Sequence, residues 1–230
     1  MKVNEILKAA TIEKQELGDQ ELDAINRYSM RKLVEDDVFV FRVVACGNEV
    51  DRDFEVFPRK SLVKLAELME GKTVIANHNP STENQKARIY RAEVVDAGGV
   101  TKTGEQYAQL VLHCYMARTE SNRDQIAEIE AGIKKEVSVG CAVESVVCSI
   151  CGKDNRKVQC EHRGGTEYGG CLCYKRLENP TDAYEVSFVA IPAQPEAGVT
   201  KSYGGTPEEG EQPKTIADLL KAAFTKETEE

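Results

Sequence analysis

Basic residues are fewer than acidic residues in this chain. Its 230 residues carry 30 Lys and Arg against 39 Asp and Glu, so the formal net charge at pH 7 is −9. Phosphate binding needs a basic surface, and this balance therefore argues against a nucleic-acid-binding protein. Tryptophan is absent, but apolar residues make up 41% and charged residues 30% of the chain, which is typical of a globular protein with one sizeable core.

Long apolar runs are also missing. No stretch approaches the roughly 20 apolar residues that a transmembrane helix needs. Residues 1–5 lack the apolar segment of a secretory signal. We therefore expect a cytoplasmic protein without a membrane partner.

The pattern of apolar residues predicts a mainly β protein. Runs rich in β-branched and aromatic residues predict strands at 38–45, 73–76, 88–95, 106–116, 136–147 and 184–191. Residues 58–71, which begin at Pro58 and end at Gly71, and residues 121–133 have the apolar spacing of helices. The strands do not alternate regularly with helices, so we predict a β-rich α+β fold in which helices surround an antiparallel β-barrel.

Three parts of the chain differ in composition. Residues 1–33 are polar and predict a peripheral helical extension with two short helices. Residues 34–200 contain the predicted strands and form the expected barrel domain. Residues 201–230 predict an acidic flexible linker and a short amphipathic helix, which docks either on its own domain or on a partner. The linker is also a candidate site of self-cleavage.

The eight cysteines are unevenly distributed. Cys46, Cys114 and Cys141 stand alone in apolar surroundings and are predicted to be buried. The other five lie within residues 148–173, together with His162. In a reducing compartment, such a cluster indicates metal binding rather than disulfides.

The spacing of the clustered residues fits zinc. The predicted ligands are Cys148, Cys151, Cys160 and His162. Cys171 or Cys173 is an alternative to one of the last two. The insert at 148–174 is rich in glycine and offers no core, so the metal would hold it together. Because the protein fills all four positions, we expect a structural site rather than a catalytic one.

A lone serine, Ser138, lies in the apolar run 136–142 and precedes Gly140 by two residues. It is either a packed hydroxyl group or a nucleophile held on a rigid strand. His78 follows a predicted strand and precedes Asn79, a position that suits either a surface turn or a general base. His113 lies inside a predicted strand and is expected to be structural.

A third group normally orients such a base. Glu185, at the start of the last predicted strand, is the candidate, although a solvated edge carboxylate is the alternative. Glu144 and Asp182 remain alternatives for the same role. Ser187 repeats the Glu-Val-Ser pattern around Ser138 and is a rival nucleophile.

Taken in order, three motifs resemble the prohead protease family of tailed bacteriophages. They are Val-Ile-Ala-Asn-His at 74–78, Val-Ser-Val-Gly at 137–140, and Glu-Val-Ser-Phe-Val at 185–189 followed by Pro-Ala-Gln-Pro-Glu-Ala at 192–197. The resemblance covers about residues 38–197. This family of capsid-maturation serine proteases shares its fold with herpesvirus assemblin.

The resemblance implies a serine endopeptidase in which Ser138 attacks the peptide, His78 takes its proton and Glu185 is the third member. It implies capsid and scaffold proteins as substrates, with self-association as a further possibility, inside the assembling prohead in the bacterial cytoplasm. Catalysis would need no cofactor, and the cysteine-rich insert departs from the common family pattern. The alternative is a noncatalytic capsid-assembly or scaffold-binding module with a structural zinc knuckle. A zinc metallohydrolase is a more distant hypothesis.

Overall fold

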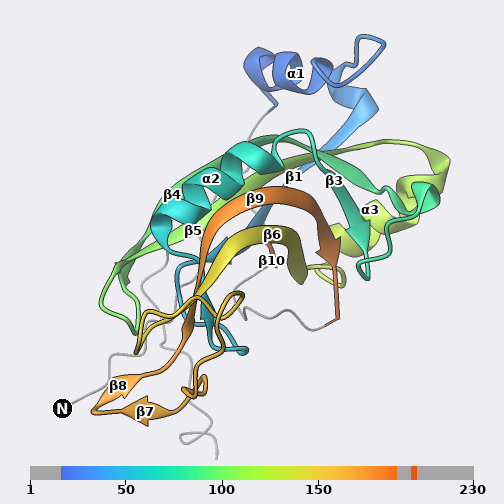
Figure 1. Ribbon diagram of the computed structural model, residues 1–230. Helices are drawn as coiled ribbons and strands as arrows, with labels where there is room; N and C mark the ends of the chain where they lie inside the picture. The colour runs from blue at the N-terminus through green and yellow to red at the C-terminus, as the bar shows by residue number, and fades with distance from the viewer. Residues whose placement is uncertain (1–16, 191–197, 201–230) are drawn as a thin grey trace, which may run out of the picture.

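One large sheet dominates the computed structural model, which describes residues 17–190 and 198–200 (Figure 1). Its strands are β1 (Val38–Gly47), β2 (Glu55–Val56), β3 (Thr73–Ala76), β4 (Ala87–Val100), β5 (Gln106–Ala117), β6 (Val137–Cys148), β9 (Lys175–Phe188) and β10 (Gly198–Thr200). A separate hairpin pairs β7 (Glu167–Tyr168) with β8 (Cys171–Leu172). The β-rich α+β class is confirmed.

The long strand β9 organises one side of this sheet. One of its edges pairs antiparallel with β6, and the other pairs parallel with β2 and β3. The remaining pairs are antiparallel and continue in the order β3, β4, β5, β1 and β10. The predicted closed barrel is wrong, because no ladder joins β6 to β1 or β10 among the described residues. The sheet is open and mixed.

Three α-helices accompany the sheet within residues 17–190. In α2 (Arg59–Met69), Leu62, Leu65 and Met69 are buried, and the helix packs on β9, β4 and β5. In α3 (Arg123–Glu130), the isoleucines at 126 and 129 are buried. Both predicted helices are therefore present, although they are shorter than the apolar spacing suggested.

The first helix lies within the segment that the sequence predicts to be an N-terminal extension. In α1 (Asp19–Asn26), Ile25 is fully buried in a small cluster with Leu33, Val38 and Tyr90. The other helix expected before residue 33 and the whole predicted tail at 201–230 lie outside the described residues. Within the described ranges, no helix is long and apolar enough to cross a membrane.

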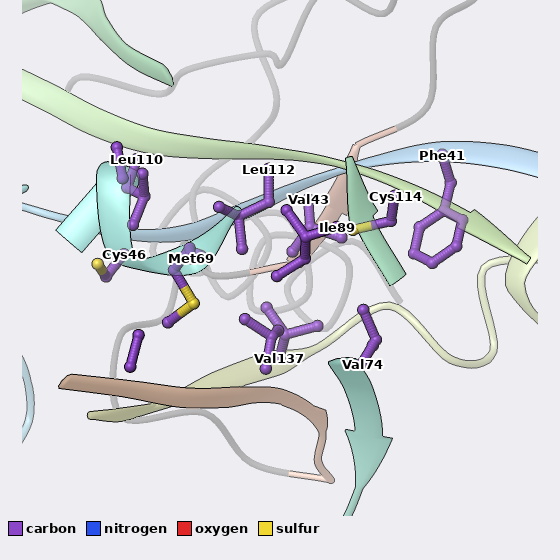
Figure 2. Packing of buried hydrophobic residues seen from close by; sticks show 14 of the residues in the cluster. Phe41, Val43, Cys46, Met69, Val74, Ile89, Leu110, Leu112, Cys114 and Val137 are labelled. Carbon is purple, nitrogen blue, oxygen red and sulfur yellow. The ribbon is translucent and has the colours of Figure 1, made fainter. Parts of the chain in front are cut away.

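The main core lies on one face of the strands that carry the site. Val74 of β3 and Val137 of β6 belong to the same buried cluster as Met69, Ile89 and Leu112 (Figure 2). Val186 and Phe188 of β9 join them. Side chains alternate between the two faces of a strand, so the residues between these apolar positions face the other way.

Candidate active site and metal centre

The face of the sheet opposite the main core brings the candidate residues together. In the register of β9, Glu185 lies opposite Gly140 on one side and Thr73 on the other. Two residues further, Ser187 lies opposite Ser138 of β6. Residues directly opposite in an antiparallel pair have Cβ atoms roughly 4.5–5.5 Å apart. The ladder therefore places Ser138 beside the strand that carries the candidate acid.

His78 reaches this face because the chain turns sharply where β3 ends. Asn77 and His78 both have left-handed backbone conformations, with φ of 55° and 50°. The N–H of Asn77 donates to the carbonyl of Phe188 at 2.9 Å, and the N–H of His78 donates to Oγ of Ser187 at 2.7 Å. The end of β9 thus stabilises a turn that few non-glycine residues adopt.

The ring of His78 is paired with the predicted acid. Its Nδ1 lies 2.8 Å from Oε1 of Glu185. The Glu185 side chain is only 10% exposed, whereas the His78 side chain is 46% exposed. The second oxygen, Oε2, is buried and has no hydrogen-bond partner. A buried carboxylate with one partner is costly, and the ring nitrogen is the group that compensates it.

Ser138 itself is half-buried. Among the described residues, no hydrogen bond joins its hydroxyl group to His78. In unliganded enzymes such bonds are often long and tighten when substrate binds, so this geometry is compatible with a serine–histidine pair. The structure thus brings His78 and Glu185 into contact and places Ser138 on the adjoining strand.

A groove of about 360 Å³ adjoins Ser138. Ser138 lines it together with residues of the main core cluster such as Cys46 and Phe57. Asp51 and Glu55 also line the groove, and burial raises the pKa of both carboxyl groups. The groove beside Ser138 thus contains acidic groups.

The two alternative acids, Glu144 and Asp182, pair with residues other than His78. Glu144 is exposed and accepts a hydrogen bond from Asn179 at 3.1 Å. The side chain of Asp182 is 51% exposed and pairs with Lys72 at 3.3 Å. Neither has a contact with His78 among the described interactions. Of the three candidate acids, only Glu185 contacts His78 among the described interactions.

Ser187 and His113 are both buried in the structure. Ser187 is fully buried, and its hydroxyl group accepts a hydrogen bond from the His78 N–H. His113 in β5 is 1% exposed, and its Nε2 lies 2.8 Å from Glu93 and 2.9 Å from Arg91. Burial lowers the pKa of His113, and its structural role is consistent with this position.

The clustered cysteines form a second site where β6 ends. The group comprises Cys148, Cys151, Cys160 and His162, with one potential ligand atom of each within 4.8 Å of the others. The group could hold a metal ion. Nδ1 of His162 is buried without a hydrogen-bond partner, and its ring lies edge-on to Tyr168 with the centroids 4.6 Å apart. A ring held in place with an unpaired buried nitrogen fits a ligand.

The environment of Cys148 favours its thiolate form. Burial raises the pKa of this thiol, but backbone N–H groups of Cys151 and Ile150 and the thiol groups of Cys160 and Cys151 lower it more, to about 6. A thiolate is the form that binds metal. The donor set therefore suits a soft divalent cation.

The cysteines outside the four-residue group differ in burial. Cys173 is 1% exposed and interacts with Cys148, and burial raises its pKa to about 11. It lies beside the four-residue group without belonging to it, and Cys171 is exposed in β8. Cys46 and Cys114 are buried as predicted, whereas Cys141 is only partly buried.

The cysteine-rich insert packs on the domain next to the groove. Lys175 donates its N–H to the carbonyl of Phe54 at 2.8 Å, and a side chain at Gly165 would clash with the Phe54 ring. Cys148 pairs with Lys175 at one end of the β6–β9 ladder, and Ser138 pairs with Ser187 near the other end. One two-stranded ribbon therefore connects the metal group to the candidate active site.

Sequence reasoning missed two features of the site. The first is the hydrogen bond from the His78 N–H to the Ser187 hydroxyl group. It depends on the parallel pairing of β3 with β9, two strands that are far apart in the sequence. Gly140 had no assigned role, although it lies directly opposite Glu185. The sequence shows that Gly140 follows Ser138 by two residues, but it does not show which residues of β9 lie opposite them.

Comparison of the chain with protein-family models, with curated proteins and with solved structures finds no match.

Proposed function

We propose that this chain is a serine endopeptidase of the prohead protease type, with Ser138 as nucleophile, His78 as general base and Glu185 as the acid that orients it. The observation that carries the proposal is the 2.8 Å contact between Nδ1 of His78 and Oε1 of Glu185, beside the strand that bears Ser138. A base oriented by a buried acid, next to a small hydroxyl group, is the arrangement that activates a serine.

The chemistry follows from these positions. Nδ1–H of His78 donates to the Glu185 carboxylate, which leaves Nε2 free to take the proton of Ser138. Oγ of Ser138 attacks the scissile carbonyl carbon, and the protonated histidine then gives its proton to the leaving amine. Water hydrolyses the resulting ester by the same route. The exposed ring of His78 and the groove along β6 leave room for an extended polypeptide.

The substrates in this proposal are capsid and scaffold proteins, cleaved inside the assembling prohead in the bacterial cytoplasm. The order of the motifs around His78, Ser138 and Glu185 supports this assignment, as does the β-rich fold. An assemblin-like arrangement of the domain belongs to the same proposal.

The insert is proposed to hold a structural zinc ion. Three thiols and one imidazole provide four soft ligands, which is the complement of a closed tetrahedral site. Such a site leaves no position for a reacting water molecule, so the ion would stabilise the insert. The ribbon of β6 and β9 would transmit that stability toward the active site.

Co-expression with the matching capsid protein tests the proposal. Mass spectrometry of both proteins is expected to show cleavage of the capsid protein, and Ser138→Ala should abolish it. Ser121→Ala, on an exposed serine in the 3-10 helix Glu120–Asn122, is the matched control and should cleave normally. Unchanged cleavage with Ser138→Ala would overturn the nucleophile assignment.

A further inference from the structure

Position 140 lies directly opposite the candidate acid. Gly140 of β6 and Glu185 of β9 are register partners in the antiparallel ladder. The two strands run side by side in Figure 1. A Cβ atom built on Gly140 would clash with Oε1 of Glu185 and would lie 3.2 Å from its Cδ. Oε1 is the same oxygen that contacts Nδ1 of His78. The carboxylate therefore occupies the space that any side chain at position 140 would fill.

The backbone does not require glycine here. Gly140 lies outside the left-handed region, unlike Gly71 at the end of α2, whose φ is 79°. An alanine could adopt the Gly140 backbone without strain. The missing side chain of Gly140 leaves a space, and the Glu185 side chain occupies it.

Glu185 has little freedom to move elsewhere. Its side chain is nine-tenths buried, and β3 and β6 pair with β9 on either side of it. A methyl group at position 140 must therefore displace the carboxylate or separate β6 from β9. Either change moves Oε1 away from the ring of His78.

We propose that Gly140 is a positioning residue, whose missing side chain lets the Glu185 carboxylate lie over β6 and hold His78 for catalysis. The proposal rests on the proposed function, because it concerns the same serine–histidine–acid site. Gly140 would thus be a fourth residue of this site, and it would act entirely through Glu185. Displacing a reacting group by about 1 Å can cost on the order of 10²-fold in rate.

A double-mutant cycle tests this inference through activity. Gly140→Ala should lower cleavage by about 10²-fold in the otherwise unchanged protein. In a Glu185→Ala background, the same substitution should cause no further loss, because the carboxylate that it displaces is already gone. An equal loss in both backgrounds, or full activity of Gly140→Ala alone, would overturn the proposal.

Two further measurements test whether Gly140 positions Glu185, and neither depends on proteolytic activity. Gly140→Ala should lower the melting temperature, and the Glu185→Ala background should remove that effect. NMR of histidine-labelled protein should show the Nδ1–H signal of His78 disappearing in Gly140→Ala. A melting temperature lowered equally in both backgrounds, or an unchanged His78 signal, would contradict the proposal.

The control is Gly18→Ala, since a Cβ atom there meets nothing within 4 Å and φ is −77°. It should leave activity and the His78 signal unchanged. If the unmodified chain cleaves nothing, the proposed function fails, while the melting and NMR measurements still decide the role of Gly140.

Discussion

Nδ1 of His78 and Oε1 of Glu185 lie 2.8 Å apart although 107 positions of sequence separate the two residues. The parallel pairing of β3 with β9 makes this contact possible, because it aligns Thr73 with Glu185 and Ala76 with Phe188. His78 then turns back over the end of β9, and its ring meets the carboxylate. Glu185 lies on a core strand and the His78 turn is hydrogen-bonded to that same strand, so the contact holds its geometry better than one between two free loops.

Replacing the acid tests whether this contact serves catalysis. Glu185→Gln keeps the size of the side chain but removes the negative charge that stabilises the histidine cation. We expect cleavage of the capsid protein to fall by about 10⁴-fold, as in other triads that lose their acid. The measurement is the initial rate of cleavage at fixed protein concentration.

Glu144→Gln is the matched control for that experiment. Glu144 belongs to the same strand ribbon but is exposed and has no contact with His78 among the described interactions. It should cleave at the unmodified rate. Equal rates for Glu185→Gln and the unmodified protein would show that Glu185 does not take part.

Ser187→Ala distinguishes a supporting serine from a nucleophile. The hydroxyl group accepts the His78 N–H at 2.7 Å, so its removal leaves a backbone donor unsatisfied and should cost about 1–3 kcal/mol in free energy of unfolding. Activity should fall but remain measurable. Chemical denaturation and cleavage rates check both expectations, and a stable, completely inactive Ser187→Ala would favour Ser187 as the nucleophile.

Metal content tests the role of the cysteine-rich insert. Elemental analysis should find one zinc ion per chain, and Cys148→Ser should remove it and lower the melting temperature. Cys171→Ser, at an exposed cysteine outside the four-residue group, should keep the metal. A zinc content well below one per chain in the unmodified protein would contradict the proposed site.

Alkylation should separate the cysteines by their environments. Burial raises the pKa of Cys141 to about 11, so at pH 8 its thiolate fraction is small and rises about tenfold per pH unit below that pKa. Exposed Cys171 should react with iodoacetamide at once, Cys141 slowly and faster with rising pH, and Cys148 only after chelation.

Peptide mapping by mass spectrometry reads each of these sites. Cys114, which is fully buried, serves as the internal control and should stay unmodified until the protein unfolds. Rapid modification of Cys148 before chelation would contradict a metal-bound thiolate.

Much of the local structure could be predicted from the sequence. The short run Thr73–Ala76 is a strand with the predicted bounds, and α2 ends before Gly71 as expected. These features depend on neighbouring residues: β-branched side chains favour strands, and glycine ends a helix at little cost.

The long-range pairing could not be predicted in the same way. An apolar run such as the predicted strand at 184–191 does not encode whether its partner is parallel or antiparallel, or which residue faces which. The open sheet and the parallel pairing of β3 with β9 therefore differed from expectation. The proximity of Glu185 to His78 was expected from the order of motifs, but the roles of Gly140 and Ser187 required the register.

The most direct test of the central claim is to treat the purified chain with a fluorophosphonate and to map the adduct by mass spectrometry. We expect one adduct per chain on Ser138, lost in Ser138→Ala and strongly reduced in His78→Ala. Failure to modify Ser138, or an adduct on Ser187 in its place, would contradict it.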